Sequence, residues 1–407
     1  MAYEFEAAAQ LRLDGYFARI GQHLKDRRKR ESFAMYAFGI LGDGERKSAE
    51  PIAARLAGDE KGVQHAHDKL LHFLARSEWD DRSVRLEAAR YALEALSARE
   101  PITTWIIDET GFLKQGTHSA GVHRQYTGSA GKIANCQVGV CLAVATATEH
   151  IPLDFELYLP RAWIDDPERR AETRIPEQIG FKTKIELALD MIRRARGAGV
   201  PGEVMLADSV YGNSAEFRNE VRQMGFDFGV QVESNIHVVR LDSRGRPSGY
   251  ALSALQLAQW RGREGFRRFT WREASKSELS SHFLFQRVKT TGNDGVTLNE
   301  REPLWLVIEW PTSEPKPTKY WLTTLPTRMS KKKIIRHLKE RWRIERVFED
   351  LKGELGLDHF EGRSFPGWHH HVSVVLCCYA YVVAERVRTF PPSWRRSSPG
   401  RPLSAAA

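Results

Sequence analysis

The first hundred residues carry apolar side chains at helical spacing, interrupted by glycines at Gly42–Gly44 and Gly58. Apolar residues three and four positions apart lie on one face of a helix. The runs of this kind are Leu11–Ile20, Phe33–Leu41, Ile52–Leu56, Leu70–Leu74 and Leu86–Leu96. We therefore predict an all-helical domain over residues 1–100.

After Pro101 the pattern changes to short β-branched and apolar runs that alternate with two helical segments. Strands are predicted at Thr103–Ile107, Cys136–Ala147, Ile151–Leu159, Glu203–Ala207 and Phe226–Val232, with helices near Thr183–Arg196 and Phe217–Met224. Three strands, a helix, a strand, a helix and a strand is the order of an RNase H-like core. We therefore predict an α/β fold, with a mixed five-stranded sheet and flanking helices, whose first part covers residues 101–233.

The remaining chain divides into three parts. Short strand-like runs separated by turn residues predict a β-rich insertion over residues 234–326. Two helical segments, one through the sequence HLKERWRIERVFEDLKGELGL and one over His369–Val387, predict that the core resumes at 327–390. The proline-, serine- and arginine-containing end, residues 391–407, reads as a disordered basic tail.

Composition narrows the class of protein. With 42% hydrophobic and 28% charged residues, the 407-residue chain is neither disordered nor fibrous, and its length predicts several domains. The net charge of +9 is compatible with a polyanionic partner. Four cysteines without paired spacing indicate reduced thiols, and no apolar stretch is long enough for a membrane span. We expect a cytoplasmic, nucleoid-associated protein without membrane contact.

Basic residues gather in the helical domain at places that suit a DNA backbone. Two short helices starting near Ser48 and Asp59 have the spacing of a helix-turn-helix. The candidate DNA contacts here are Arg27, Arg28, Lys29, Arg30, Arg46 and Lys47. A solvated helix face and ordinary helix packing would produce the same pattern.

The predicted insertion mixes basic and aromatic side chains, with Arg267 and Arg268 among its candidate DNA contacts. Arginine suits phosphates and aromatic rings suit unstacked bases. An exposed antiparallel sheet has the same composition, so both interpretations remain open.

Three acids occupy positions that suit a divalent-metal site. Asp108 is predicted to end the first core strand and Asp208 the fourth, and Glu345 lies in a late helix. In an RNase H-like sheet these two strands are neighbours, so their terminal acids come together. Carboxylate oxygens are the ligands that Mg²⁺ prefers, and two such ions can promote phosphoryl displacement. A helix cap or turn is the alternative role for either aspartate, and a solvated ion pair for Glu345.

The late helix adds two cations to this set. Arg341 and Lys352 lie four residues before and seven residues after Glu345, which predicts that all three share one helical face. Cations beside a metal-binding acid suit a nuclease, because they can hold DNA phosphates.

With these motifs, the sequence resembles the DDE transposases of bacterial insertion sequences, in the group named after insertion sequence 4 and especially the family named after insertion sequence 701. The resemblance runs from about residue 30 to 388. It is carried by WIIDETGFLKQG (105–116), HRQYTGSAGKIANCQVGV (123–140), VMLADSVYG (204–212), YWLTTLP (320–326), RWRIERVFEDLKGELGLDHFEGRS (341–364) and GWHHHV (367–372). The family's tyrosine–arginine–glutamate–lysine signature is matched by Arg341, Glu345 and Lys352, whereas Leu338 stands at the tyrosine position.

The resemblance implies a catalytic triad of Asp108, Asp208 and Glu345 that holds two Mg²⁺ ions, with Mn²⁺ as a substitute. It implies a homodimer that binds terminal inverted repeats in double-stranded DNA. Metal-activated water would release a 3′-hydroxyl, which then attacks target DNA in cut-and-paste transposition. In relatives that form a hairpin, a tryptophan stacks on a flipped base; Trp321 or Trp310 has this position, although either also suits a structural core.

Other functions remain as alternatives. A domesticated, catalytically silent DNA-binding regulator would need no intact triad, and a simple nuclease would need no end-recognition domain. A phosphatase of the haloacid dehalogenase type would need a second aspartate two residues after Asp108, where Thr110 stands. The glycines form no phosphate-binding loop, so no nucleotide cofactor is expected.

Overall fold

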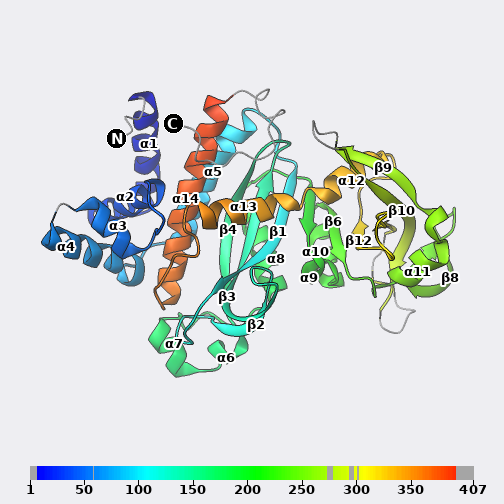
Figure 1. Ribbon diagram of the computed structural model, residues 1–407, viewed down its shortest axis with the longest axis horizontal. Coiled ribbons are helices and arrows are strands. Elements are labelled where there is room, and N and C mark those ends of the chain that lie inside the picture. The colour runs from blue at the N-terminus through cyan, green and yellow to red at the C-terminus, as the bar shows by residue number, and fades with distance from the viewer. Residues whose placement is uncertain (1–6, 58, 273–277, 293–297, 300–301, 391–407) are drawn as a thin grey trace. The chain divides into compact units, whose positions relative to one another are not determined.

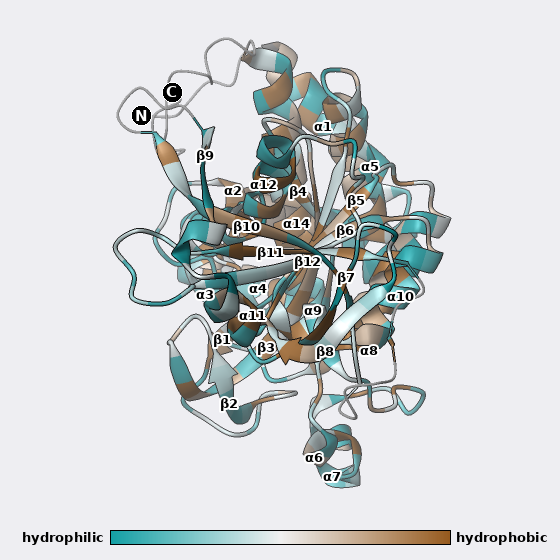
Figure 2. Ribbon diagram, turned by 90° about the vertical axis from the view of Figure 1, so that its right-hand side faces the viewer, coloured by the Kyte–Doolittle hydropathy of each residue, from teal (hydrophilic) through white to brown (hydrophobic). Residues whose placement is uncertain are grey.

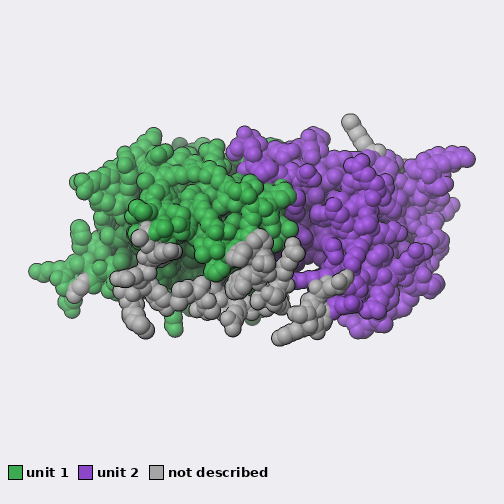
Figure 3. Space-filling view, turned by 90° about the horizontal axis from the view of Figure 1, so that it is seen from above, with its two compact units in different colours: residues 1–102, 109–195, 344–407 green, residues 103–108, 196–343 purple. Residues whose placement is uncertain are grey.

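The computed structural model describes residues 7–57, 59–272, 278–292, 298–299 and 302–390, so the predicted tail at 391–407 lies outside the described residues. The chain forms two compact units, coloured separately in Figure 3. The first comprises residues 1–102, 109–195 and 344–407, and the second comprises residues 103–108 and 196–343. Strand β1 (Thr104–Leu113) and helix α13 (Trp342–Gly353) each contribute residues to both units.

The first unit begins with helices, as the spacing of apolar residues predicts. They are α1 (Ala7–Gly21), α2 (Arg27–Leu41), α3 (Ala49–Leu56), α4 (Glu60–Leu71), the π-helical turn η1 (His72–Arg76) and α5 (Asp81–Ser97). Aspartates begin three of them, because the side chains of Asp26, Asp59 and Asp80 accept backbone N–H groups of α2, α4 and α5.

The strands of the first unit pair around β3 (Lys132–Ala145). Strand β2 (His123–Thr127) pairs antiparallel with its first residues, and β4 (His150–Tyr158) pairs antiparallel with Val138–Ala145. Short helices α6 (Arg161–Ile164) and α7 (Pro167–Thr173) and the longer α8 (Lys184–Gly197) follow.

Helix α14 (Phe365–Thr389) is the central helix of the first unit and is buried over most of its length. It lies beside α5 and packs on β4 (Figure 1). All four cysteines are buried, and two of them lie in α14. Over the described residues, no helix combines the length and apolar character of a membrane span.

The consecutive histidines of α14 have separate structural partners, as expected from their divergent helical directions. His369 lies near Glu156, and Nδ1 of His370 lies 2.7 Å from the Leu74 carbonyl. The Nε2–H of His371 donates to the Gly356 carbonyl at 3.1 Å, while its Nδ1 lies 2.9 Å from the Tyr36 hydroxyl. Because a carbonyl only accepts, Nε2 of His371 carries a proton.

In the second unit, β1 pairs parallel with β5 (Val204–Ala207), and β5 pairs parallel with β6 (Asp227–Val232). The prediction of a five-stranded sheet is wrong in one respect, because β6 is no edge. Strand β12 (Lys319–Thr323) pairs antiparallel with β6, which satisfies backbone groups that an edge would expose. The mixed sheet has twelve described strands, in the order β2-β3-β1-β5-β6-β12-β11-β10-β7-β8, with β4 beside β3 and β9 beside β10.

The segment predicted as a β-rich insertion supplies the strands beyond β12 and one helix that was not predicted, α11. Figure 2 shows β10 and β11 largely brown, in agreement with their buried apolar residues. The elements are β7 (His237–Leu241), β8 (Pro247–Ser253), α11 (Ala254–Arg261), η2 (Arg263–Gly265), β9 (Arg267–Arg272), β10 (Leu279–Thr290) and β11 (Leu304–Glu309). Helices α9 (Ser209–Gly212), α10 (Ala215–Gln223) and α12 (Lys331–Lys339) complete this unit.

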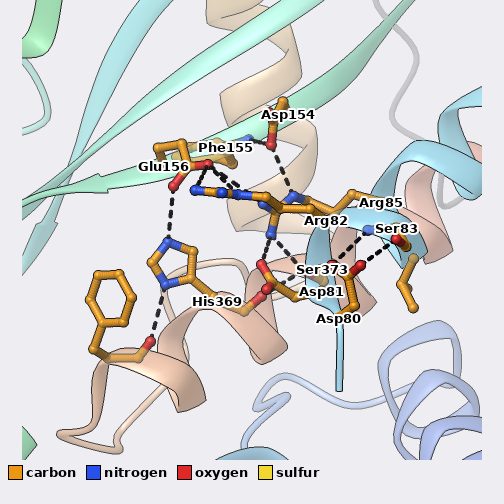
Figure 4. Close-up of polar contacts among 12 residues, drawn as sticks. Asp80, Asp81, Arg82, Ser83, Arg85, Asp154, Phe155, Glu156, His369 and Ser373 are labelled. Atoms are coloured by element: carbon orange, nitrogen blue, oxygen red, sulfur yellow. Dashed lines mark hydrogen bonds and ion pairs between the residues drawn. The ribbon is translucent and has the colours of Figure 1, made fainter. Parts of the chain in front are cut away.

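A buried cluster of charges joins α5, β4, α8 and α14 within the first unit (Figure 4). Arg85 is 1% exposed and donates to Asp154 at 3.0 Å and to Ser373 at 2.8 Å, with a further ion pair to Asp81. Arg194 holds Asp154 at 2.7 Å and Glu156 at 2.8 Å.

Charges within this cluster balance. Burial alone would raise the pKa of Glu156, but His369, 3.4 Å away, together with Arg85 and Arg82, holds that pKa well below its usual range. The cluster contains as many arginines as carboxylates. The arginines are Arg82, Arg85 and Arg194, and the carboxylates are Asp81, Asp154 and Glu156.

Replacing Arg85 with methionine removes the shared cation and leaves buried carboxylates partly unpaired. Loss of one partner of a buried ion pair costs about 3–5 kcal/mol, so urea denaturation should show a clearly lower midpoint for Arg85→Met. Arg27→Met is the control, because Arg27 pairs with Glu31 on the surface and its loss costs about 0–1 kcal/mol. Equal midpoints for the two variants would contradict the proposed importance of the cluster.

Acid should destabilise the chain through His370 and His371, because burial lowers the pKa of each imidazole to about 4. In the unfolded chain both take up protons near pH 6.5, so the stabilisation is complete above that pH and is lost as pH falls toward 4. The urea midpoint should therefore fall between pH 7.5 and 4.5. In the His371→Gln variant the urea midpoint should depend less on pH. An unchanged pH dependence would contradict the role of His371 in acid destabilisation.

Candidate active site

Asp108 and Asp208 are brought to neighbouring positions by the parallel pairing of β1 with β5. The paired positions run from Thr104↔Val204 to Ile107↔Ala207, so each aspartate is the next residue on its strand. Neighbouring strands lie about 4.8 Å apart. The predicted proximity of these two acids is therefore a consequence of strand register within the second unit.

The prediction that the first core strand ends at Asp108 is wrong, because β1 continues to Leu113. Its pairing with β5 ends at Ile107, but Phe112 further on is buried against Phe155 and Trp368 in the first unit. Strand β1 is also a hydrogen-bonded neighbour of β3, so it continues after its pairing with β5 has ended and Asp108 lies inside the strand.

The Asp108 carboxylate is 7% exposed and forms an ion pair with Arg341. The prediction that Arg341 lies on one helix with Glu345 and Lys352 is wrong. The backbone turns at Glu340–Arg341, between α12 and α13, so a shared helical face does not extend to Arg341. Its cation reaches the site as the partner of Asp108 instead.

Asp208 begins helix α9. Its Oδ1 accepts the backbone N–H of Val210 at 2.9 Å, so the helix-cap role considered from the sequence is present. The cap fixes the direction of the carboxylate immediately after β5. Capping therefore positions this acid next to the place where the pairing of β1 with β5 ends, beside Asp108.

Glu345 lies in the first turn of α13 and belongs to the first unit. Buried Ile344, Val347 and Leu351 anchor the helix, and Glu345 is exposed. Seven residues later, Lys352 donates to the Gly111 carbonyl at 2.7 Å and also contacts Ser129 Oγ at 3.1 Å.

The Lys352 ammonium is therefore tied to strand β1 in the first unit. Burial lowers the pKa of Lys352, and its ammonium lies 5.3 Å from the centre of the Phe112 ring. These contacts position the side chain in a way that the sequence alone did not indicate.

The donor chemistry of Asp108 and Asp208 fits a hard divalent cation, since both offer carboxylate oxygens from neighbouring strands. Across the described ranges, no group of three histidine, cysteine, aspartate or glutamate side chains is gathered closely enough to hold a metal ion. The two aspartates are thus the part of the predicted metal site that a single unit brings together.

The predicted DNA contacts of the helical segment lie in different surroundings. Arg27, Arg28 and Arg30 are exposed on α2, whereas Lys29 donates to the Glu78 carbonyl at 2.6 Å. Arg46 pairs with Glu361 at 2.6 Å on the surface.

Lys47 differs from these residues because its side chain is buried. It is 7% exposed, donates to the Gly42 carbonyl, and has its pKa lowered by burial. Its ammonium stabilises the turn after α2 through the hydrogen bond to the Gly42 carbonyl.

In the second unit, Arg267 and Arg268 are exposed on β9, and Arg268 contacts Ser280 Oγ at 3.1 Å. Trp321 on β12 is 4% exposed, with the Lys339 ammonium 5.3 Å from its ring centre. The core role considered for Trp321 is therefore the one its burial favours.

Sequence reasoning missed Lys184, which forms an ion pair with Glu109 inside the first unit. A lone lysine at the start of α8 gave no signal of this pairing. Leu338, at the departure from the family signature, is buried, and its side chain lies against Gly229 of β6.

Comparison with known proteins agrees with this arrangement. The family model described as DDE superfamily endonuclease matches residues 19–278, and the one described as transposase DDE domain matches residues 177–381. The chain is also 26% identical, over 90% of its length and 85% of the relative's, to a protein of Microchaete diplosiphon described as "Probable transposase for insertion sequence element IS701".

Each family match covers more than half of the chain, and the two overlap across the segment that carries Asp208. The acids, the mixed sheet and the matches lead to one assignment. The chain belongs to the DDE superfamily of transposases and endonucleases, enzymes that act on DNA and generally use divalent metal ions.

Proposed function

We propose that this chain is the transposase of an insertion sequence: it binds the terminal inverted repeats, cleaves the DNA ends and joins the 3′-hydroxyl ends to target DNA. The observation that carries the proposal is the register of β1 and β5, which makes Asp108 and Asp208 neighbours. Glu345 is assigned as the third acid from the sequence motif, with Arg341 before it and Lys352 after it.

Two reactions at phosphorus make up the proposed cycle. In the first, water adds to phosphorus and the bond to the 3′ oxygen breaks, leaving a 3′-hydroxyl and a 5′-phosphate. In the second, that hydroxyl attacks a target phosphodiester and displaces its 3′ oxygen, so no external energy source is required. Divalent cations, in our proposal two Mg²⁺ that Mn²⁺ can replace, would neutralise developing charge and lower the pKa of the attacking water.

The residues of the chain have distinct roles in this scheme. Asp108 and Asp208 supply oxygen ligands from adjacent strands, and Glu345 supplies a third carboxylate. The Arg341 guanidinium, now paired with Asp108, would hold a phosphate oxygen of the DNA end. Lys352, tied to the Gly111 carbonyl, would keep a positive charge beside β1.

The other segments are assigned by charge and by local structure. Residues 1–100 would recognise the DNA ends, with α3 and α4 as the helix pair and Arg27, Arg28 and Arg30 exposed for phosphate contacts. Residues 234–326 would form an insertion that contacts DNA. Residues 101–233 and 327–390 would form an RNase H-like core.

We further propose a homodimer, so that the two ends of the element are processed together. A domesticated regulator that binds these ends without cutting them is the alternative, and cleavage assays separate the two.

Replacing any of the three acids should abolish cleavage of labelled DNA that carries the element's own terminal sequence. In Mg²⁺ or Mn²⁺, the wild type should cut at the end, whereas Asp108→Asn, Asp208→Asn and Glu345→Gln should lose about a hundred- to a thousandfold in rate, the loss typical when one preorganised electrostatic group is removed. Glu349→Gln is the matched control, because Glu349 is an exposed acid four residues further along the same helix. Tight binding by a wild type that never cuts would favour the regulator.

Arg341→Ala should slow single-turnover cleavage more than it weakens binding of the DNA end. Loss of a charged hydrogen bond costs about 1.5–3 kcal/mol, which corresponds to roughly 10- to 150-fold in rate. Arg341→Lys should recover part of the rate, since it restores charge but not the two-pronged geometry. Arg328→Ala, at an exposed arginine before α12, should cleave normally. Equal rates for Arg341→Ala and wild type would remove Arg341 from the proposed site.

A further inference from the structure

Two large aromatic side chains are exposed on β8 and α11, two elements of the second unit that contact each other. Tyr250 of β8 is 89% exposed, and Trp260 of α11 is 57% exposed. Exposed apolar surface that is gathered in one place, unlike a single exposed side chain, marks binding sites. We name the surface made by Tyr250, Trp260, Arg240 and Arg261 the aromatic–arginine face.

The backbone of this face is well fixed. Ser253 and Gln256 form a capping box at the start of α11, directly after β8, and Leu257 and Ala258 are buried. Trp260 lies at the end of the same helix, beside its buried face, and most of its ring is exposed. The ring is therefore held out on a rigid element and not on a loop.

Arginines flank the Trp260 ring. The Arg240 guanidinium carbon lies 4.2 Å from the ring centre, and that of Arg261 lies 5.0 Å from it. Arg240 also reaches Gly249, where an added Cβ would stand 3.1 Å from its Nη2. Arg240 therefore reaches from the Trp260 ring to the backbone of β8 at the residue before Tyr250.

These arginines carry uncompensated charge. Among the described residues neither Arg240 nor Arg261 has a carboxylate partner, and Arg261 donates to the neutral Gln286 at 2.6 Å. By contrast, nearby Arg246 pairs with Asp242 at 3.1 Å. From His237 to Arg272 the chain has eight arginines and no lysine, against the two acids Asp242 and Glu264.

Exposed planar rings combined with unpaired guanidinium groups match the chemistry of single-stranded DNA. Unstacked bases lie on aromatic rings, and arginines hold the adjacent phosphates. In duplex DNA the bases are already stacked on each other, so the rings would have no base face to contact. A protein partner would leave the charge unmatched unless it were strongly acidic.

We infer that the aromatic–arginine face binds single-stranded DNA, with bases stacked on Tyr250 and Trp260 and phosphates held by Arg240 and Arg261. This inference deepens the proposed function, because DNA ends opened by cleavage or fraying would supply such a strand. Stacking tolerates any base, so the binding is expected to be independent of sequence.

The test is fluorescence anisotropy with a labelled oligo-dT strand and, separately, a blunt duplex carrying the terminal sequence, both without divalent cations. Tyr250→Ala and Trp260→Ala should each weaken binding of the single strand about tenfold or more and change duplex binding less than twofold. Tyr250→Phe and Trp260→Phe should retain most of the affinity, because the ring remains. Leu279→Ala, at an exposed apolar residue of the same unit, is the control and should bind both probes as the wild type does.

Salt dependence gives a second readout. Arg261→Gln should lower the slope of log affinity against log salt concentration by about 0.7, the loss of one phosphate contact on a single strand. An unchanged slope would remove Arg261 from the face.

The inference is overturned if both alanine variants bind oligo-dT like the wild type. It is also overturned if they bind normally but sediment as monomers while the wild type sediments as a dimer, because the face would then join subunits. Since no cleavage is measured, the outcome is separate from that of the proposed function: single-strand binding without end cleavage would support the face and refute the transposition cycle.

Discussion

Parallel pairing between β1 and β5 places the two aspartates, and most other features of the candidate site depend on that pairing. A shift of one residue would move Asp108 out of step with Asp208 and turn its side chain to the other face of the strand. The register is supported at the opposite end of the strand pair, where the Trp105 indole donates to the Pro201 carbonyl at 2.6 Å. Gly202 contributes as well, because a Cβ there would collide with the Trp105 ring.

Charge is used differently in the two units. In the first, buried Arg85 and the more exposed Arg82 and Arg194 pair with Asp81, Asp154 and Glu156, and these pairs offset the cost of burying charge. In the second, guanidinium groups around Trp260 lie at the surface without acids. The first arrangement holds elements together, and the second leaves binding capacity for an anion.

Much of the fold follows from local sequence patterns. The run Glu203–Ala207 predicted β5 to within one residue. The apolar periodicity before Pro101 predicted helices where α1 to α5 lie. Helix α11 was missed because it has only eight residues, too few to show a clear helical period between the surrounding strand signals.

For the candidate site, the sequence identified the two aspartates but not their immediate surroundings. The pairing of Arg341 with Asp108 depends on a turn at Glu340–Arg341 in a segment that has continuous helical periodicity. The burial of Lys47 depends on contacts far away in sequence, such as the bond from its backbone N–H to His359. Tertiary contacts of this kind leave no local pattern.

The attachment of β12 to β6 has a consequence for how the chain folds. Residues 227–232 cannot complete their hydrogen bonding until residues 319–323 have been made, and β5 needs β1 from a hundred positions earlier. In the first unit, α5 can likewise complete its packing only after α14, which ends at Thr389, has been made. Pairings so distant along the chain require closure of long loops and slow the search for the native state. On a ribosome, the strands that carry the aspartates would therefore become fully paired only after most of the polypeptide had emerged.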